Sequence, residues 1–255
     1  GQADIALGNV VGSNICNILL ILGLSALAAP LIVQPQLVRF DVPVMIGASL
    51  MLIALCLDGN LSRLDGALLF TGILVYTTVL IRKSRRDKAL AEASATDIEL
   101  DADPKAHPGK YIAFIVVGLV MLVLGSQWLV DGAVMLARSV GVSELVIGLT
   151  IVAVGTSLPE LATSVAASLK GQRDIAIGNV IGSNIFNIFC VLGLSSLVAP
   201  NGIRVAPQAL ILDLPVMLWV AALCLPLFYY GLQISRLRGA MLLAGYSAYV
   251  WFLIP

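Results

Sequence analysis

The chain has 255 residues, of which 59% are hydrophobic and only 12% charged, and its formal net charge is zero. Its mean hydropathy is +1.00. Because soluble domains carry about 25% charged residues, this composition excludes an ordinary water-soluble protein and indicates one that lies in a membrane.

A membrane-spanning helix needs about 17–25 mostly apolar residues. Eight stretches of this kind predict eight transmembrane helices and an all-α integral membrane protein. In chain order they are 5–29, 37–57, 64–81, 111–139, 145–169, 175–199, 208–229 and 237–254.

The segment 82–110 is the longest polar stretch, and its position sets the orientation of the chain. If it is cytoplasmic, alternation of the helices leaves only Arg63, Arg138 and Arg204 outside among the 15 Lys and Arg residues. The positive-inside rule therefore predicts a cytoplasmic 82–110 segment and an external C-terminus. The segment turns acidic after Lys88, which is typical of a flexible linker.

Four cysteines lie within the apolar stretches, and none forms a CxxC pair. We expect them to be small hydrophobic residues, with neither a metal site nor a disulfide framework. The one histidine, His107, lies in the polar linker. No prosthetic group is expected.

An internal repeat divides the chain. Residues 1–30 match residues 171–200 at 21 of 30 positions without a gap. Five predicted crossings separate the two copies, so they run through the membrane in opposite directions and the repeat is inverted. In transporters, inverted repeats place the substrate site near the middle of the membrane, between the halves.

Two predicted helices precede the second copy, whereas nothing precedes the first. We expect about two further helices upstream of Gly1 in the intact protein. On this view 1–81 is the remainder of a first five-helix repeat, 82–110 the linker and 111–255 the second repeat.

The predicted helix 145–169 carries the motif GTSLPE, and its Glu160 lies within an otherwise uncharged stretch. A carboxylate inside a membrane is costly and needs a partner or a function. Thr156 lies one turn from Glu160. Pro159 cannot donate to the Gly155 carbonyl, and Gly155 favours local unwinding. Together these groups are the hard oxygen ligands that Ca²⁺ and Na⁺ prefer.

A structural alternative is a kinked helix in which Glu160 forms a salt bridge. No Lys or Arg lies in the middle of any apolar stretch, so an exchangeable cation is the simpler counter-charge.

The two copies of the repeat carry GSNICN (12–17) and GSNIFN (182–187). In each motif the Ser and the second Asn are four residues apart and share a helix face, which predicts ion coordination by both copies. The alternative is helix packing through small and amide residues. We expect Asn14 and Asn184, on another face, to lock packing.

These motifs resemble the two alpha repeats of the cation/calcium exchanger superfamily, in its prokaryotic sodium/calcium exchanger branch. The resemblance implies ten helices in two inverted halves, eight of them present here, that exchange Na⁺ for Ca²⁺. It implies as ligands, with Ala153 acting through its carbonyl, Ser13, Asn17, Ala153, Thr156, Ser157, Glu160, Ser183 and Asn187. It also implies a second GTSxPE motif upstream. Many relatives have Asp at the position of Asn187, which favours the potassium-independent type here.

Three other acidic residues have simpler interpretations. Asp41 and Asp213 each precede a proline by two residues, which predicts helix N-caps. Asp131 lies about two turns inside the outer end of its helix, where hydration at the membrane interface is the default and a role in ion entry is the alternative.

The sequence therefore predicts an inner-membrane antiporter, not an enzyme, whose partners are Na⁺, Ca²⁺ and lipid, with no nucleic acid; it is compatible with a monomer. The alternative within transport is Ca²⁺/H⁺ exchange, with Glu160 binding a proton. A hydrolase with Ser157 as nucleophile lacks a membrane-embedded base. A membrane scaffold would not need Glu160.

Overall fold

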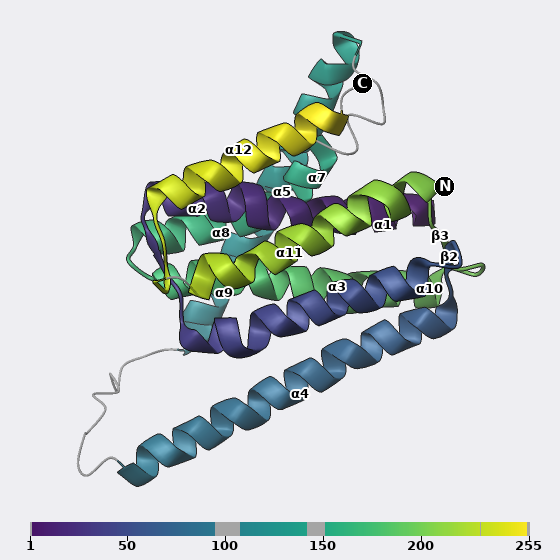
Figure 1. Ribbon diagram of the computed structural model, residues 1–255. Helices are drawn as coiled ribbons and strands as arrows, with labels where there is room; N and C mark the ends of the chain where they lie inside the picture. Colours follow the sequence, from purple (N-terminus) through teal and green to yellow (C-terminus); the bar gives the residue numbers. More distant parts are fainter. Residues whose placement is uncertain (1, 95–107, 142–150, 230, 254–255) are drawn as a thin grey trace.

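The computed structural model describes residues 2–94, 108–141, 151–229 and 231–253, and these are almost entirely helical (Figure 1). The α-helices are α1 Gln2–Cys16, α2 Leu22–Ala28, α3 Val42–Cys56, α4 Arg63–Ser94, α5 Pro108–Ser139, α7 Ala153–Thr156, α8 Leu158–Leu169, α9 Arg173–Phe186, α10 Gly193–Val198, α11 Leu214–Tyr229 and α12 Arg236–Leu253.

Four π-helical turns join some of these helices into longer rods. They are η1 Asn17–Ile21, η2 Leu37–Asp41, η4 Asn187–Leu192 and η5 Ala209–Asp213. Turns η1 and η4 begin at the last Asn of the two GSNIxN motifs. Since π-turns within helices are rare and occur frequently at functional sites, their position draws attention to these two asparagines.

Six described helical stretches are long and apolar enough to cross a membrane. They are Ala6–Ala28, Leu37–Cys56, Arg63–Arg86, Val116–Ser139, Arg173–Val198 and Ala209–Tyr229. Of the two other predicted spans, 145–169 lies partly outside the described residues, and 237–254 corresponds largely to the 18-residue helix α12.

The helix predicted at 64–81 is longer than expected, because α4 continues to Ser94. Residues 82–94 are rich in Lys, Arg, Ala, Leu and Glu, which are good helix formers in water as well as in lipid. The amino-terminal part of the predicted linker is therefore helical, and residues 95–107 lie outside the described part of the chain.

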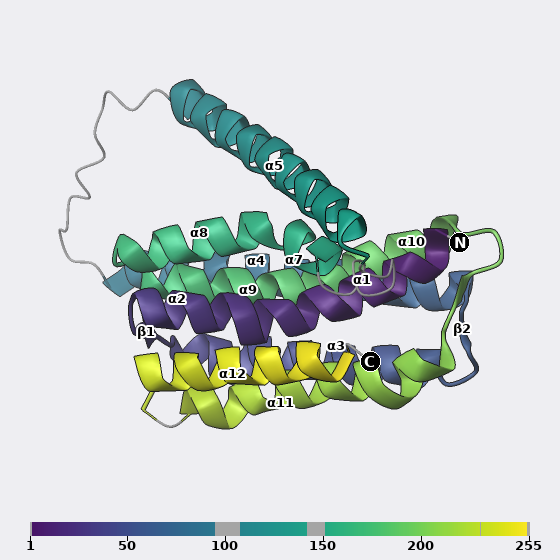
Figure 2. The ribbon, with the colours of Figure 1, turned by 90° about the horizontal axis from the view of Figure 1, so that it is seen from above.

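Two rods, α1–η1–α2 and α9–η4–α10, lie within the bundle and contact one another, as Figures 1 and 2 show. Helix α2 packs on α12, α10 packs on α4, and α3 packs on α11. Helix α5 stands at an angle to the bundle (Figure 2) and contacts chiefly α7 and α8. Buried apolar side chains of both rods form the centre of the core.

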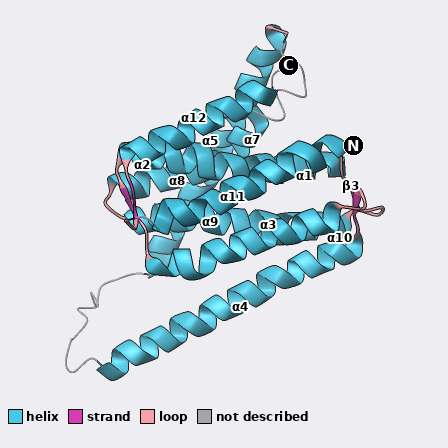
Figure 3. Cartoon of the chain, in the orientation of Figure 1, coloured by secondary structure: helices cyan, strands magenta, loops and turns pink. Residues whose placement is uncertain are grey.

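The contacts follow the internal repeat. Packing of α2 on α12 is equivalent to packing of α10 on α4. Two short antiparallel ladders behave in the same way: β1 Leu31–Ile32 pairs with β4 Gln233–Ile234, and β3 Ile203–Arg204 pairs with β2 Asn60–Leu61. Figure 3 shows these strands at opposite ends of the bundle. Each ladder joins a segment before the linker to one after it.

The N-cap prediction for Asp41 and Asp213 is wrong. Both residues end π-turns that run into α3 and α11, and Asp41 makes no capping hydrogen bond. Their carboxylates instead accept hydrogen bonds from tyrosines on the following helix: Tyr76 donates to Asp41 at 2.8 Å, and Tyr249 donates to Asp213 at 3.3 Å. Each carboxylate therefore ties two neighbouring helices together.

Helices α4 and α10 cross where two glycines meet. A Cβ added at Gly193 would lie 2.9 Å from the backbone nitrogen of Phe70 and 3.2 Å from the carbonyl oxygen of Gly66. Close approach of backbones through small residues is typical of helix packing in membranes.

We expect Gly193→Ala to destabilise the protein by about 1–3 kcal/mol, because the helices must separate to admit the methyl group. Gly47→Ala in α3, where no atom lies within 4 Å of the added Cβ, is the matched control and should leave stability unchanged or slightly raised. Thermal unfolding of the purified protein in detergent measures both. Equal midpoints for the two variants would contradict the close crossing.

Candidate cation-binding site

The predicted helix 145–169 is broken at Ser157, between α7 and α8. Ser157 has φ −96° and ψ 3°, outside helical geometry, and Pro159 lies in the first turn of α8. The Gly155 carbonyl, which Pro159 cannot satisfy, accepts a hydrogen bond from the Ser126 hydroxyl of α5 at 2.5 Å. The expected loosening of this carbonyl is confirmed.

Glu160 lies in the first turn of α8 and is half-buried. Its Oε2 atom is shielded from solvent and has no hydrogen-bond partner in the described part of the chain. The amino-terminal position on α8 favours a negative charge through the helix dipole. A buried carboxylate oxygen without a donor is costly, so this atom is suited to a cation ligand.

Thr156, at the end of α7, reaches the first repeat motif. Its hydroxyl lies 3.2 Å from the hydroxyl of Ser13 on α1 and 3.2 Å from Oδ1 of Asn9. Ser157 is buried directly after it. The hydroxyls predicted from the two motifs therefore lie together, although 143 residues separate Ser13 from Thr156.

Glu160, Ser183 and Asn187 share one pocket of about 350 Å³, lined also by Asn179, Phe186 and two glycines, Gly178 and Gly182. No atom lies within 4 Å of a Cβ added at either glycine, so the absence of side chains there keeps this space open. The predicted ligands of α8 and α9 thus face the same space.

Asn17 and Ala153 complete the predicted set. Asn17 is only 1% exposed; its Nδ2 donates to Oδ1 of Asn184 at 2.9 Å, while its own Oδ1 is buried without a partner among the described residues. Ala153 is the first residue of α7, one turn before Ser157. Its backbone therefore lies next to the break.

Comparison with known proteins places this arrangement in a family. The sequence pattern described as sodium/calcium exchanger protein matches residues 1–82 and 110–254, which is most of the chain. The chain belongs to the sodium/calcium exchanger protein family. Sodium and calcium are the transported substrates that this family's name gives, and its members are exchangers, not enzymes.

Relatives in this exchanger family cover nearly the whole chain. It is 31% identical over 280 residues to the sodium/calcium exchanger MaX1 of Methanosarcina acetivorans, covering 97% of this chain and 79% of that protein. It is 40% identical over 222 residues to the inner membrane protein YrbG of Escherichia coli K12, covering 86% and 67%. A solved structure of the sodium-calcium exchanger NCX_Mj matches with a TM-score of 0.75 and 31% identity, over 94% of this chain and 74% of that one.

Two asparagines that sequence reasoning missed extend the polar faces of this exchanger. Asn179 on α9 donates to Ser164 at 2.9 Å, to Thr163 at 3.0 Å and to the Glu160 carbonyl at 3.3 Å. It therefore holds α8, with its carboxylate, against α9. Asn9 is its counterpart in the repeat and contacts Thr156. Each lies four residues before the motif serine, and that spacing could have revealed both.

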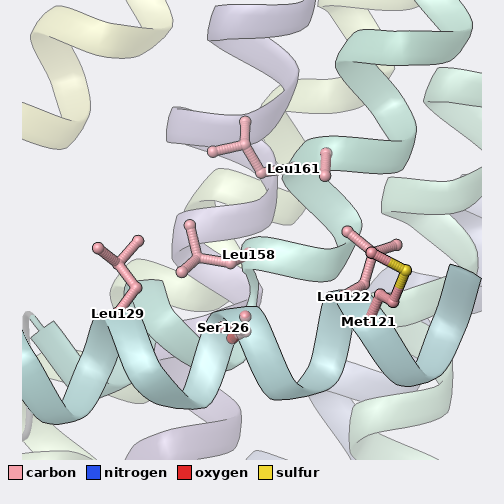
Figure 4. Close-up of a pocket in the computed structure, with 8 residues that line it drawn as sticks. Met121, Leu122, Ser126, Leu129, Leu158 and Leu161 are labelled. Atoms are coloured by element: carbon pink, nitrogen blue, oxygen red, sulfur yellow. The ribbon is translucent and has the colours of Figure 1, made fainter.

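The other side of the broken helix is apolar. A pocket of about 270 Å³ lies between α5 and α8, and Figure 4 shows Met121, Leu122 and Leu129 of α5 around it with Leu158 and Leu161 of α8. Ser126, the donor to Gly155, also lines it. The oxygen ligands and the apolar surface are thus separated on two sides of the same break.

Asp131 on α5 is exposed. No contact in the described part of the chain joins it to the pocket of Glu160. Its expected place at the membrane interface stays a prediction.

Proposed function

We propose that this chain is a secondary antiporter in which Na⁺ entering down its gradient drives Ca²⁺ out of the cell. Both ions use one set of oxygens in turn. The ligands in this proposal are Ser13, Asn17, Ala153, Thr156, Ser157, Glu160, Ser183 and Asn187.

The observation that carries this proposal is the buried, unpartnered Oε2 of Glu160 at a helix break. The carboxylate shares a pocket with Ser183 and Asn187, and the Thr156 hydroxyl one turn away meets Ser13. Ca²⁺ takes six to eight oxygen ligands, including carboxylate, hydroxyl, amide and backbone oxygens. Membership of the sodium/calcium exchanger family supports the same pair of ions.

The two halves, 1–81 and 111–255, are in this proposal related by an inverted repeat. Support comes from equivalent contacts in the two halves: the exchanged ladders β1–β4 and β3–β2, and the tyrosine bonds to Asp41 and Asp213. The GSNIxN helices then meet at the axis between the halves, where alternating access can expose one site to either side.

We place the protein in the inner membrane with the 82–110 segment cytoplasmic and the C-terminus outside. The excess of Lys and Arg on one side supports this orientation. In Figure 1 the cytoplasmic end would be the one at which α4 ends, and the end marked N and C would be external. A relative described as an inner membrane protein supports the location.

The test is uptake of radiolabelled Ca²⁺ into proteoliposomes that hold the protein expressed from its complete coding region. We expect an outward Na⁺ gradient to drive Ca²⁺ uptake and a pH gradient alone to leave it at the level of protein-free liposomes. Collapse of the Na⁺ gradient with an ionophore is the control. Uptake that follows the pH gradient and ignores Na⁺ would instead establish Ca²⁺/H⁺ exchange, with Glu160 as the proton carrier.

A further inference from the structure

Four asparagines form a hydrogen-bonded network where the two central rods cross. Asn14 and Asn17 come from the first GSNIxN motif, and Asn184 and Asn187 come from the second. Asn14 and Asn184 are 2% and 1% exposed, so the centre of the network is inaccessible to water. Any amide placed there must find its partners within the protein.

Backbone carbonyls fix the orientation of the two central amides. Nδ2 of Asn14 donates to the carbonyl oxygen of Asn184 at 3.3 Å, and Nδ2 of Asn184 donates to the carbonyl oxygen of Asn14 at 3.3 Å. A carbonyl oxygen can only accept, so neither amide can be reversed without placing two oxygens together.

The fixed amides in turn orient the outer pair. Oδ1 of Asn184 accepts from Nδ2 of Asn17 at 2.9 Å, and Oδ1 of Asn14 accepts from Nδ2 of Asn187 at 3.0 Å. Each outer asparagine therefore uses its nitrogen within the network. What remains for another ligand is its oxygen, and Oδ1 of Asn17 is buried without a hydrogen-bond partner among the described residues.

We propose that Asn14 and Asn184 are positioning residues of the cation site: they hold the Asn187 and Asn17 amides with oxygen, not nitrogen, directed to the ion. The inference rests on the proposed cation site and adds two residues that do not touch the ion. A reversed amide would present N–H groups, which repel a cation and cannot coordinate it.

The arrangement works across the crossing. Each central asparagine orients the outer asparagine of the opposite rod: Asn184 of α9 orients Asn17, and Asn14 of α1 orients Asn187. The ligand sets of the two rods therefore depend on one another, and a change at the centre of one rod is felt at the outer ligand of the other.

The test is Ca²⁺ affinity of the purified protein in detergent, measured by titration calorimetry. Asn184→Leu keeps the size of the side chain but removes the acceptor for Asn17, so the Asn17 amide loses its orientation. We expect Ca²⁺ affinity to fall about 10- to 100-fold, the usual range for loss of a group that orients a metal ligand. Met45→Leu is the matched control. It removes only a 3.6 Å sulfur contact to Nδ2 of Asn184 and should leave affinity unchanged.

Rescue separates orientation from packing. In the Asn17→Asp background the ligand is a carboxylate with two equivalent oxygens, which needs no orienting acceptor. There we expect Asn184→Leu to change Ca²⁺ affinity by no more than about 2-fold, the usual limit for independent sites. A purely structural role for Asn184 predicts the same loss with either residue at position 17, and that result would overturn the proposal.

Two further outcomes are distinguishable. If the wild type binds neither Ca²⁺ nor Na⁺, the proposed cation site itself fails; if it binds Ca²⁺ and Asn184→Leu binds equally well, only the positioning role fails. Should Asn184→Leu not give a folded protein, the mirrored pair Asn14→Leu with Asn187→Asp decides by the same comparison. Failure of that rescue also overturns the inference.

Discussion

Glu160→Gln is expected to abolish Na⁺-driven Ca²⁺ uptake while leaving a folded protein in the membrane. The amide keeps the size of the side chain and one oxygen but removes the charge that offsets dehydration of a divalent ion. Loss of one partner from a buried charge pair costs about 3–5 kcal/mol. Ca²⁺ affinity should therefore fall at least about 100-fold. Proteoliposome uptake and a size-exclusion profile measure transport and folding.

The matched control is Asp131→Asn on α5, which removes one carboxylate at an exposed position. It should transport Ca²⁺ as the wild type does, because no described contact links Asp131 to the pocket of Glu160. Wild-type uptake by Glu160→Gln would show that its carboxylate is structural and that the site lies elsewhere.

Gly155→Ala is the second substitution for which we expect a large effect. A Cβ at Gly155 would lie 1.9 Å from Cγ2 of Val130 on α5, a distance that no side-chain packing allows. Either α5 or the broken helix must move, and Thr156 and Ser157 follow directly. We expect stability to fall by about 1–3 kcal/mol and uptake to be lost with it.

Val130→Ala should rescue this variant, because it removes the clashing methyl group and leaves only the Val130 Cβ, at 3.2 Å. Gly125→Ala is the control on α5, since no atom lies within 4 Å of its added Cβ. Thermal unfolding and Ca²⁺ uptake are measured on the single and double variants. Equal loss in Gly155→Ala with and without Val130→Ala would contradict the contact as the cause.

Much of the fold could be predicted because hydrocarbon imposes a simple rule on sequence. Apolar stretches of sufficient length marked the helices, and the repeat marked the two rods that cross at the centre. The site motifs were visible for a related reason: Glu160 and the paired asparagines are polar groups in apolar surroundings. The expectation that Asn14 and Asn184 lock packing is confirmed by their bonds across the two rods.

Other features depend on contacts that the sequence does not display. The two-residue ladders form because distant connections meet at the ends of the bundle, and no local pattern indicates them. Asp41 has the local signature of a cap, but the neighbouring Tyr76 offers a better partner. The extension of α4 to Ser94 follows from helix propensity in a segment whose charge suggested a linker.

The π-turns after the GSNIxN motifs have a consequence for variation in this sequence. Each π-turn holds one residue more than the α-turn it replaces, so removing one residue from the four after Asn17 would restore a regular helix. Because each residue advances an α-helix by about 100°, Gly23 would then turn by that angle away from the helix it meets. A Cβ at Gly23 would lie 2.9 Å from Leu243 of α12, so this face admits no other residue of the rod without rearrangement. Insertions and deletions are thus excluded between Asn17 and Gly23, although point substitutions among the intervening apolar residues preserve the helical phase that joins the ion ligands to the rest of the bundle.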